Sequence, residues 1–160
     1  MCNSIETTNY REQLEKDGLL VNRPFGISMR PMLKQGRDTI VVEKIKQKPK
    51  ENDVVLYQRS KNKYVLHRVI KVTDDGYIIR GDNCIRNEYD ITDKHIIGVL
   101  TAFYRKDKYI DCNTSRGYKL YVFWWRKTFF IRVVFMFAFS CIRRILSKVK
   151  RSLIKTKKPS

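Results

Sequence analysis

The sequence predicts a mainly β fold: a coiled antiparallel β-sheet with a short N-terminal helix and a long, basic and aromatic C-terminal helix. Segments rich in Val, Ile and Tyr recur between residues 38 and 111, and polar turns separate them. This pattern is typical of half-buried strands. Residues 118–155 contain neither Pro nor Gly, so they can form a continuous helix.

The N-terminal helix is expected over residues 7–20, where Thr7 or Thr8 can cap the first turn and Gly18 can end the helix. Strands are expected at residues 38–45, 53–59, 64–72, 77–80 and 96–104, with residues 108–111 as a further candidate. The polar segments 60–63 and 74–76 suit hairpin turns. We therefore expect the helix to cover one end of an antiparallel sheet.

Length and charge indicate one domain with an appended tail. A chain of 160 residues allows one sizeable core. Residues 116–160 hold 13 of the 34 Lys and Arg residues and none of the 16 Asp and Glu residues. Residues 1–115 therefore have 21 basic against 16 acidic residues, and the net charge of +18 comes mostly from the tail. The expected division is a domain over 1–115 and a basic, aromatic helical tail over 116–160.

The tail has the pattern of a helix at a membrane surface. Its longest stretch with a single charge, residues 128–142, would be only about 22 Å long as a helix, which is short of a ~30 Å hydrocarbon core. At 100° per residue, six basic residues fall on one side: Lys119, Arg126, Arg144, Lys148, Arg151 and Lys155. Tyr121, Trp124 and Trp125 suit the headgroup level. The alternative is a helix whose first turns pack on the β-domain while its basic end stays solvated.

The cysteines and the N-terminus bear on compartment and cofactors. Cys2, Cys84, Cys112 and Cys141 are widely spaced, and two His residues are too few for a zinc cluster. Reduced thiols are expected, with no metal or organic cofactor. The first residues are polar and no apolar run of signal-peptide length follows them.

The polar N-terminus predicts a protein on the cytoplasmic side. The basic, aromatic tail predicts that it associates with an anionic membrane there.

Three motifs bring a hydroxyl, an imidazole and a carboxylate within reach of one site: Ser28-Met-Arg-Pro, Leu-His67-Arg-Val and Arg-Gly-Asp82-Asn. A serine hydrolase needs these three groups. Pro31 keeps the Ser28 segment rigid and non-helical. His67 alternates onto one face with Val65 and Val69, where partial burial favours a neutral imidazole that can accept a proton. The hairpin between the two strands should bring Asp82 close to His67.

Each of these residues also has a simpler interpretation when taken alone. Ser28 suits a turn in which its hydroxyl bonds the local backbone, and Asp82 suits an Asp-Asn turn. His67 suits a core position with satisfied hydrogen bonds. The order and number of the motifs favour the hydrolase.

Together these motifs resemble the signal peptidase family and its relatives, the self-cleaving repressors of the SOS response (the signal peptidase/LexA-like clan). The matching segments cover residues 26–100: Ser28-Met29-x-Pro31, Gly36-x-Asp38, Asp53-Val54-Val55, His67-Arg68-Val69-Ile70, Gly81-Asp82-Asn83 and Ile97-Gly98-Val99. His67 stands where the bacterial housekeeping enzymes have a lysine. This feature is similar to the archaeal, endoplasmic-reticulum and spore-former types.

The resemblance implies a serine endopeptidase that cleaves a leader or signal-like peptide through an acyl-enzyme. Ser28 would be the nucleophile, His67 the general base and Asp82 its partner, with backbone N–H groups near Ser28 holding the oxyanion. The housekeeping enzymes resemble one another in an N-terminal transmembrane anchor. This sequence has instead the basic, aromatic helix at its C-terminal end.

Two other classes of function stay open. The net charge also suits a self-cleaving, repressor-like nucleic-acid-binding regulator, although residues 1–25 are too short for a helix-turn-helix domain and the basic tail is rich in Phe and Trp. Nucleic acid is therefore not the expected partner. An inactive peptide-binding scaffold is the other possibility, and the intact Ser28, His67 and Asp82 argue against it.

Overall fold

The computed structural model describes residues 9–60 and 63–156. It contains three helices and eight strands within these residues. The helices are α1 (Tyr10–Asp17), α2 (Arg116–Lys127) and α3 (Phe129–Thr156). The strands are β1 (Leu19–Asn22), β2 (Asp38–Lys44), β3 (Val54–Ser60), β4 (Lys63–Thr73), β5 (Gly76–Arg80), β6 (Glu88–Ile91), β7 (Ile96–Arg105) and β8 (Lys108–Asp111). The prediction of a mainly β fold with a short N-terminal helix and helical C-terminal residues is confirmed.

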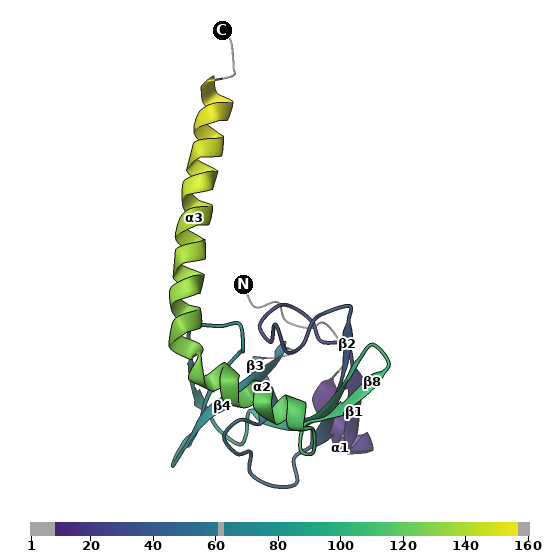
Figure 1. Ribbon diagram of the computed structural model, residues 1–160. Helices are drawn as coiled ribbons and strands as arrows, with labels where there is room; N and C mark the ends of the chain where they lie inside the picture. The colour runs from purple at the N-terminus through teal and green to yellow at the C-terminus, as the bar shows by residue number, and fades with distance from the viewer. Residues whose placement is uncertain (1–8, 61–62, 157–160) are drawn as a thin grey trace. The chain divides into compact units, whose positions relative to one another are not determined.

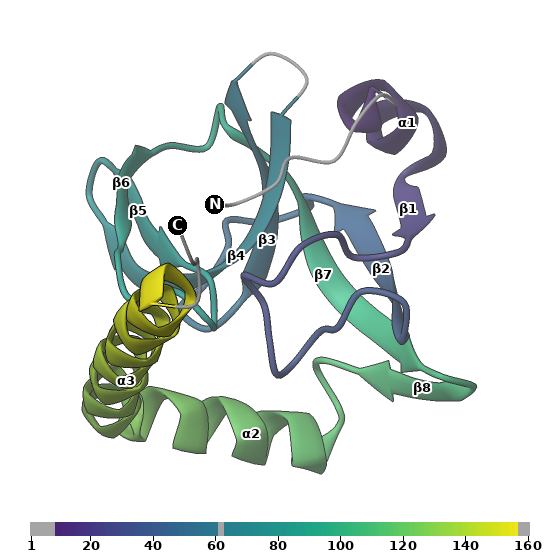
Figure 2. The ribbon, with the colours of Figure 1, turned by 90° about the horizontal axis from the view of Figure 1, so that it is seen from above.

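All strands of the described residues belong to one antiparallel sheet with the order β1-β2-β7-β3-β4-β5-β6, and β8 pairs with β7. Helix α1 packs beside β1 (Figure 1). The hairpin predicted at residues 74–76 joins β4 and β5, where Thr73 pairs with Gly76. The hairpin predicted at 60–63 joins β3 and β4, although residues 61–62 lie outside the described part. Figure 2 shows the sheet curling, so that β6 faces back toward β3 and β4.

The curled sheet buries side chains on both faces of its central strands. Six consecutive residues of β4, from Tyr64 to Val69, are buried. Alternate residues of this strand contribute to two different clusters, with Tyr64 and Leu66 in one and Val65 and Val69 in the other. Neighbouring residues on β4 therefore face different surroundings, which decides the partners of His67 and Arg68.

Helix α1 is shorter than predicted. Its cap is Asn9, whose side chain accepts a hydrogen bond from the Glu12 N–H at 3.4 Å, whereas Thr7 and Thr8 lie outside the described residues. Gly18 ends the helix as predicted, in a left-handed conformation with a φ of 70°. The last two residues of the predicted helix, Leu19 and Leu20, begin strand β1 instead. β1 is thus one of two strands that the sequence analysis missed, and β6 is the other.

The predicted continuous C-terminal helix is interrupted at Thr128, between α2 and α3. The Arg132 guanidinium donates a hydrogen bond to the Trp125 carbonyl at 2.6 Å. In a continuous helix this carbonyl would accept from the backbone N–H of residue 129. The Thr128 hydroxyl likewise donates to the Trp124 carbonyl at 2.7 Å, a bond that often bends helices.

The compact unit that contains the sheet extends to Val122, and residues 123–160 form a second unit. The boundary lies inside α2 rather than before residue 116. Tyr118 and Tyr121 pack against the larger core cluster, and Val122 is buried. The first turns of α2 therefore belong to the β-domain. None of the helices in the described residues is both long and apolar enough to cross a membrane.

Candidate active site

The Ser28 segment is held by the apolar residues that follow it. Met29, Met32 and Leu33 are buried in the core, and the Leu33 N–H donates to the Met29 carbonyl at 2.9 Å. Ser28 itself is only partly buried. The motif thus combines a buried apolar anchor with a serine that is partly open to solvent.

Gly81 is the point at which the Ser28 segment meets His67. The Ser28 carbonyl accepts a hydrogen bond from the Asn83 N–H at 2.7 Å. A Cβ atom added to Gly81 would lie 2.7 Å from the Ser28 carbonyl oxygen, 2.9 Å from His67 Nε2 and 3.0 Å from Cys84 Sγ. These three groups therefore surround one position, and a side chain there would separate them. The glycine allows the close approach.

His67 is 1% exposed and lies on β4 opposite Val55 of β3. Its Nε2 atom, which faces Gly81, is buried and has no hydrogen-bond partner among the described residues. An orphaned buried nitrogen costs free energy unless a partner binds it. The Ser28 hydroxyl does not hydrogen-bond to this nitrogen, although the backbone of the Ser28 segment and His67 Nε2 approach the same position at Gly81.

Glu88, a residue that the sequence analysis missed, holds the other ring nitrogen. His67 Nδ1 lies 3.0 Å from Glu88 Oε1. The Tyr57 hydroxyl donates to Glu88 Oε2 at 2.6 Å, and Arg59 makes a two-pronged ion pair with the same carboxylate. The only sequence signal was an acidic residue shortly after Gly-Asp-Asn. Glu88 lies on β6, which is short and polar. Because the sequence did not predict this strand, it gave no reason to expect Glu88 near β4.

Asp82, the predicted partner of His67, instead forms an ion pair with Arg68, whereas the carboxylate beside His67 Nδ1 belongs to Glu88. The Arg68 guanidinium binds both oxygens of Asp82, with Nε–Oδ1 at 2.8 Å and NH2–Oδ2 at 2.7 Å. The Tyr121 hydroxyl also donates to Oδ2 at 3.0 Å. Arg68 follows His67 on β4 and so points to the opposite face. A guanidinium that is 1% exposed needs a carboxylate, and Asp82 supplies it.

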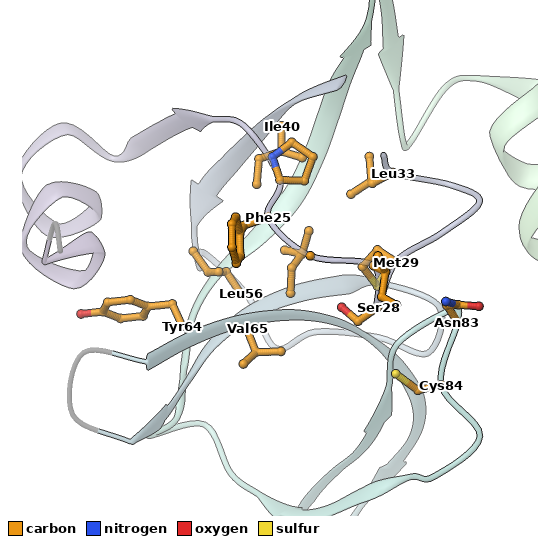
Figure 3. A pocket seen from close by; sticks show the side chains of 14 residues that line it. Phe25, Ser28, Met29, Leu33, Ile40, Leu56, Tyr64, Val65, Asn83 and Cys84 are labelled. Carbon is orange, nitrogen blue, oxygen red and sulfur yellow. The ribbon is translucent and has the colours of Figure 1, made fainter. Parts of the chain in front are cut away.

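An apolar cleft of about 170 Å³ opens beside Ser28 (Figure 3). Ser28 lies at one end with Asn83 and Cys84, and Phe25 and Tyr64 lie toward the other end. Most of the remaining lining is aliphatic: Ile27, Leu33, Ile40, Leu56, Val65 and Leu66. The cleft can therefore take an apolar segment that ends beside the serine.

The described residues contain no group of three or more His, Cys, Asp or Glu side chains that could hold a metal ion. Cys84 and Cys112, the cysteines whose side chains the structure describes, form no disulfide. Burial raises the pKa of the Cys112 thiol to about 12, which makes it a poor nucleophile.

Comparisons of the chain with protein-family models, with curated proteins and with solved structures find no match.

The environment of Glu88 predicts acid sensitivity. Burial alone would raise the pKa of Glu88, but His67, Tyr57 and Arg59 outweigh it and lower the pKa from 4.5 to about 2. A carboxylate whose pKa is lower in the folded state than in the unfolded state stabilises the fold at pH values above its ordinary pKa. This stabilisation disappears as the pH falls toward the folded-state pKa. Between about pH 5 and about pH 2.5, the wild type should therefore lose about 2 kcal/mol more of its unfolding free energy than Glu88→Gln.

Urea unfolding at the two pH values measures this difference. Glu43→Gln is the matched control, since Glu43 pairs with exposed Lys46 at a long distance of 3.4 Å, and it should keep the wild-type pH dependence. An equally steep pH dependence in Glu88→Gln would mean that the carboxylate is not held by these partners.

Proposed function

We propose that this protein is a serine endopeptidase of the signal peptidase-like clan, with Ser28 as the nucleophile, His67 as the general base and Glu88 as the carboxylate that orients His67. The observation that carries the proposal is the state of the His67 ring. Nδ1 is held by Glu88, while Nε2 is buried, has no hydrogen-bond partner among the described residues and faces the Ser28 segment.

The proposed reaction is acyl transfer to Ser28. His67 Nε2 accepts the hydroxyl proton while the oxygen attacks the carbonyl carbon of a peptide bond. Glu88 stabilises the imidazolium that results, and backbone N–H groups near Ser28 stabilise the oxyanion. The imidazolium then protonates the leaving amine. Water, deprotonated by His67, hydrolyses the ester and regenerates the serine.

The cleft supports a leader or signal-like peptide as the substrate. Its aliphatic and aromatic lining suits the apolar segment of such a peptide, and Ser28 stands at its end. Screening a peptide library for cleavage by the wild type and by Ser28→Ala tests the proposal, and only the wild type should cleave. DNA binding by the full chain without any peptide cleavage would instead favour the repressor-like regulator.

We also propose that the helical tail binds an anionic membrane surface. On α3, large apolar side chains are exposed, among them Phe130 at 80% and Phe135 at 70%. Arg143 and Arg144 on the same helix are exposed as well. Exposed aromatic and basic side chains on one helix suit the anionic cytoplasmic leaflet, because apolar burial and charge attraction add together.

Deleting residues 128–160 should abolish binding to anionic vesicles and leave the β-domain folded. The deletion keeps the turns of α2 that carry Tyr118, Tyr121 and Val122, which a cut before residue 118 would remove from the core. Each Lys or Arg near the membrane surface contributes about 1 kcal/mol of binding free energy at low salt. High salt weakens this electrostatic contribution but not the contribution of apolar burial. Sedimentation with phosphatidylserine-containing and neutral vesicles at two salt concentrations measures the electrostatic and the apolar contributions to binding.

The matched variants are Arg143→Gln/Arg144→Gln in the tail and Lys46→Gln/Lys48→Gln in the β-domain, where both lysine side chains are 83% exposed. The tail pair should weaken binding about 30-fold, and the β-domain pair should change it little. If the full-length protein ignores anionic vesicles at low salt, the membrane proposal is wrong.

A further inference from the structure

Arg59 lies next to the proposed triad but outside it, at the exposed end of β3. Its NH2 contacts Glu88 Oε1, its Nε donates to Glu88 Oε2 at 3.1 Å, and NH2 also donates to the Tyr57 hydroxyl at 3.2 Å. The strands β3 and β6 are not neighbours in the sheet. The pair of Arg59 and Glu88 therefore closes across the curled sheet, over the strand that carries His67.

The Tyr57 hydroxyl has one proton, and its neighbours decide where that proton goes. Tyr57 is fully buried, and its oxygen lies 2.6 Å from Glu88 Oε2 but 3.5 Å from His67 Nδ1. Since Arg59 donates to the Tyr57 oxygen and Glu88 accepts the Tyr57 proton, that proton is not available to His67. Nδ1 must then carry the ring proton and donate it to Glu88, which leaves the lone pair on Nε2.

We infer that Arg59 is a positioning residue: it fixes the Glu88 carboxylate and the Tyr57 proton, and so holds His67 in the tautomer whose Nε2 can accept a proton from Ser28. This inference rests on the proposed function for its catalytic consequence. The Glu88 side chain is 25% exposed, so without Arg59 it can turn toward water. The Tyr57 hydroxyl is then free to donate to His67 Nδ1. The ring proton moves to Nε2, where it blocks the base.

Arg59→Gln is the test, because Arg59 is exposed and belongs to neither core cluster. With a substrate selected on the wild type, kcat should fall about 10- to 100-fold while KM changes less than about twofold, as expected when a reacting group is displaced. Arg59→Lys keeps the charge but not the two-pronged geometry, and should recover part of kcat. Nitrogen-15 NMR of the histidine ring should show the Nδ1–H tautomer of His67 in the wild type and a larger Nε2–H fraction in Arg59→Gln.

Arg11→Gln is the matched control. Arg11 donates to the Gln58 side chain at 3.4 Å and to the Lys94 carbonyl at 3.1 Å, so the same charge is lost without touching Glu88. It should keep the wild-type kcat and tautomer. An unchanged kcat and an unchanged tautomer in Arg59→Gln would overturn the inference. If the wild type cleaves no peptide, the proposed function fails, and the NMR measurement still decides whether Arg59 sets the tautomer.

Discussion

Replacing Ser28 with Ala should abolish peptide cleavage by this protein while the fold stays intact. In a serine peptidase, loss of the nucleophile removes covalent catalysis and typically lowers kcat by a factor on the order of 10⁶. Ser28 is only partly buried, and the anchoring of its segment depends on Met29, Met32 and Leu33. Removing one hydroxyl should therefore leave the stability nearly unchanged. Cleavage of a selected peptide, followed by mass spectrometry and paired with urea unfolding of the same sample, measures both quantities.

Two further variants make this result specific. His67→Ala should lose about as much activity as Ser28→Ala, because the two side chains act as a unit. Ser60→Ala, at the exposed end of β3, is the matched serine control and should keep wild-type turnover. Undiminished cleavage by Ser28→Ala would refute the serine mechanism.

Asp82→Asn should destabilise the fold strongly and leave the chemistry of the folded protein nearly intact. Asp82 is 5% exposed and neutralises Arg68, which is 1% exposed. Breaking a buried ion pair by removing one charge leaves the other uncompensated, at a cost of about 3 kcal/mol. Because Asp82 does not contact His67 Nδ1, the kcat per folded molecule should stay within about threefold of the wild type. Urea unfolding and turnover at low temperature separate the two effects.

The controls test whether Asp82 is structural. Asp107→Asn, in the exposed turn between β7 and β8, should change the unfolding free energy by less than about 0.5 kcal/mol. Adding Arg68→Met to Asp82→Asn removes the unpaired charge and should recover part of the lost stability. A stable Asp82→Asn protein with a loss of activity on the order of 10⁴ would instead restore Asp82 to the triad.

Local patterns were enough to find most of the sheet. The alternating Val, Ile and Tyr segments correspond to β2, β3, β4, β5, β7 and β8, with ends that differ by at most one residue. The two missed strands, β1 and β6, are only four residues long. A strand of this length shows little alternation, and its pairing with a longer neighbour is what makes it a strand.

The interruption of the C-terminal helix shows a similar limit. Helix propensity predicts a continuous helix because neither Pro nor Gly occurs there. At the break, the Arg132 side chain donates to the Trp125 carbonyl in place of a backbone N–H. No propensity scale contains this contact, which forms only once the helix itself has formed.

The sequence by itself determined six of the eight described strands, the loop of Ser28 and the face of β4 on which His67 lies, since these follow from alternation and from the backbone preferences of Pro and Gly. Only the tertiary structure decided which carboxylate pairs with His67 and which pairs with Arg68. His67 and Arg68 are neighbours in the chain, yet the pleat sends them to opposite faces, so that Asp82 meets the guanidinium and Glu88 meets the imidazole. Curling of the sheet brings β6 toward β3, and pairings between distant segments of this kind are not encoded in any local pattern.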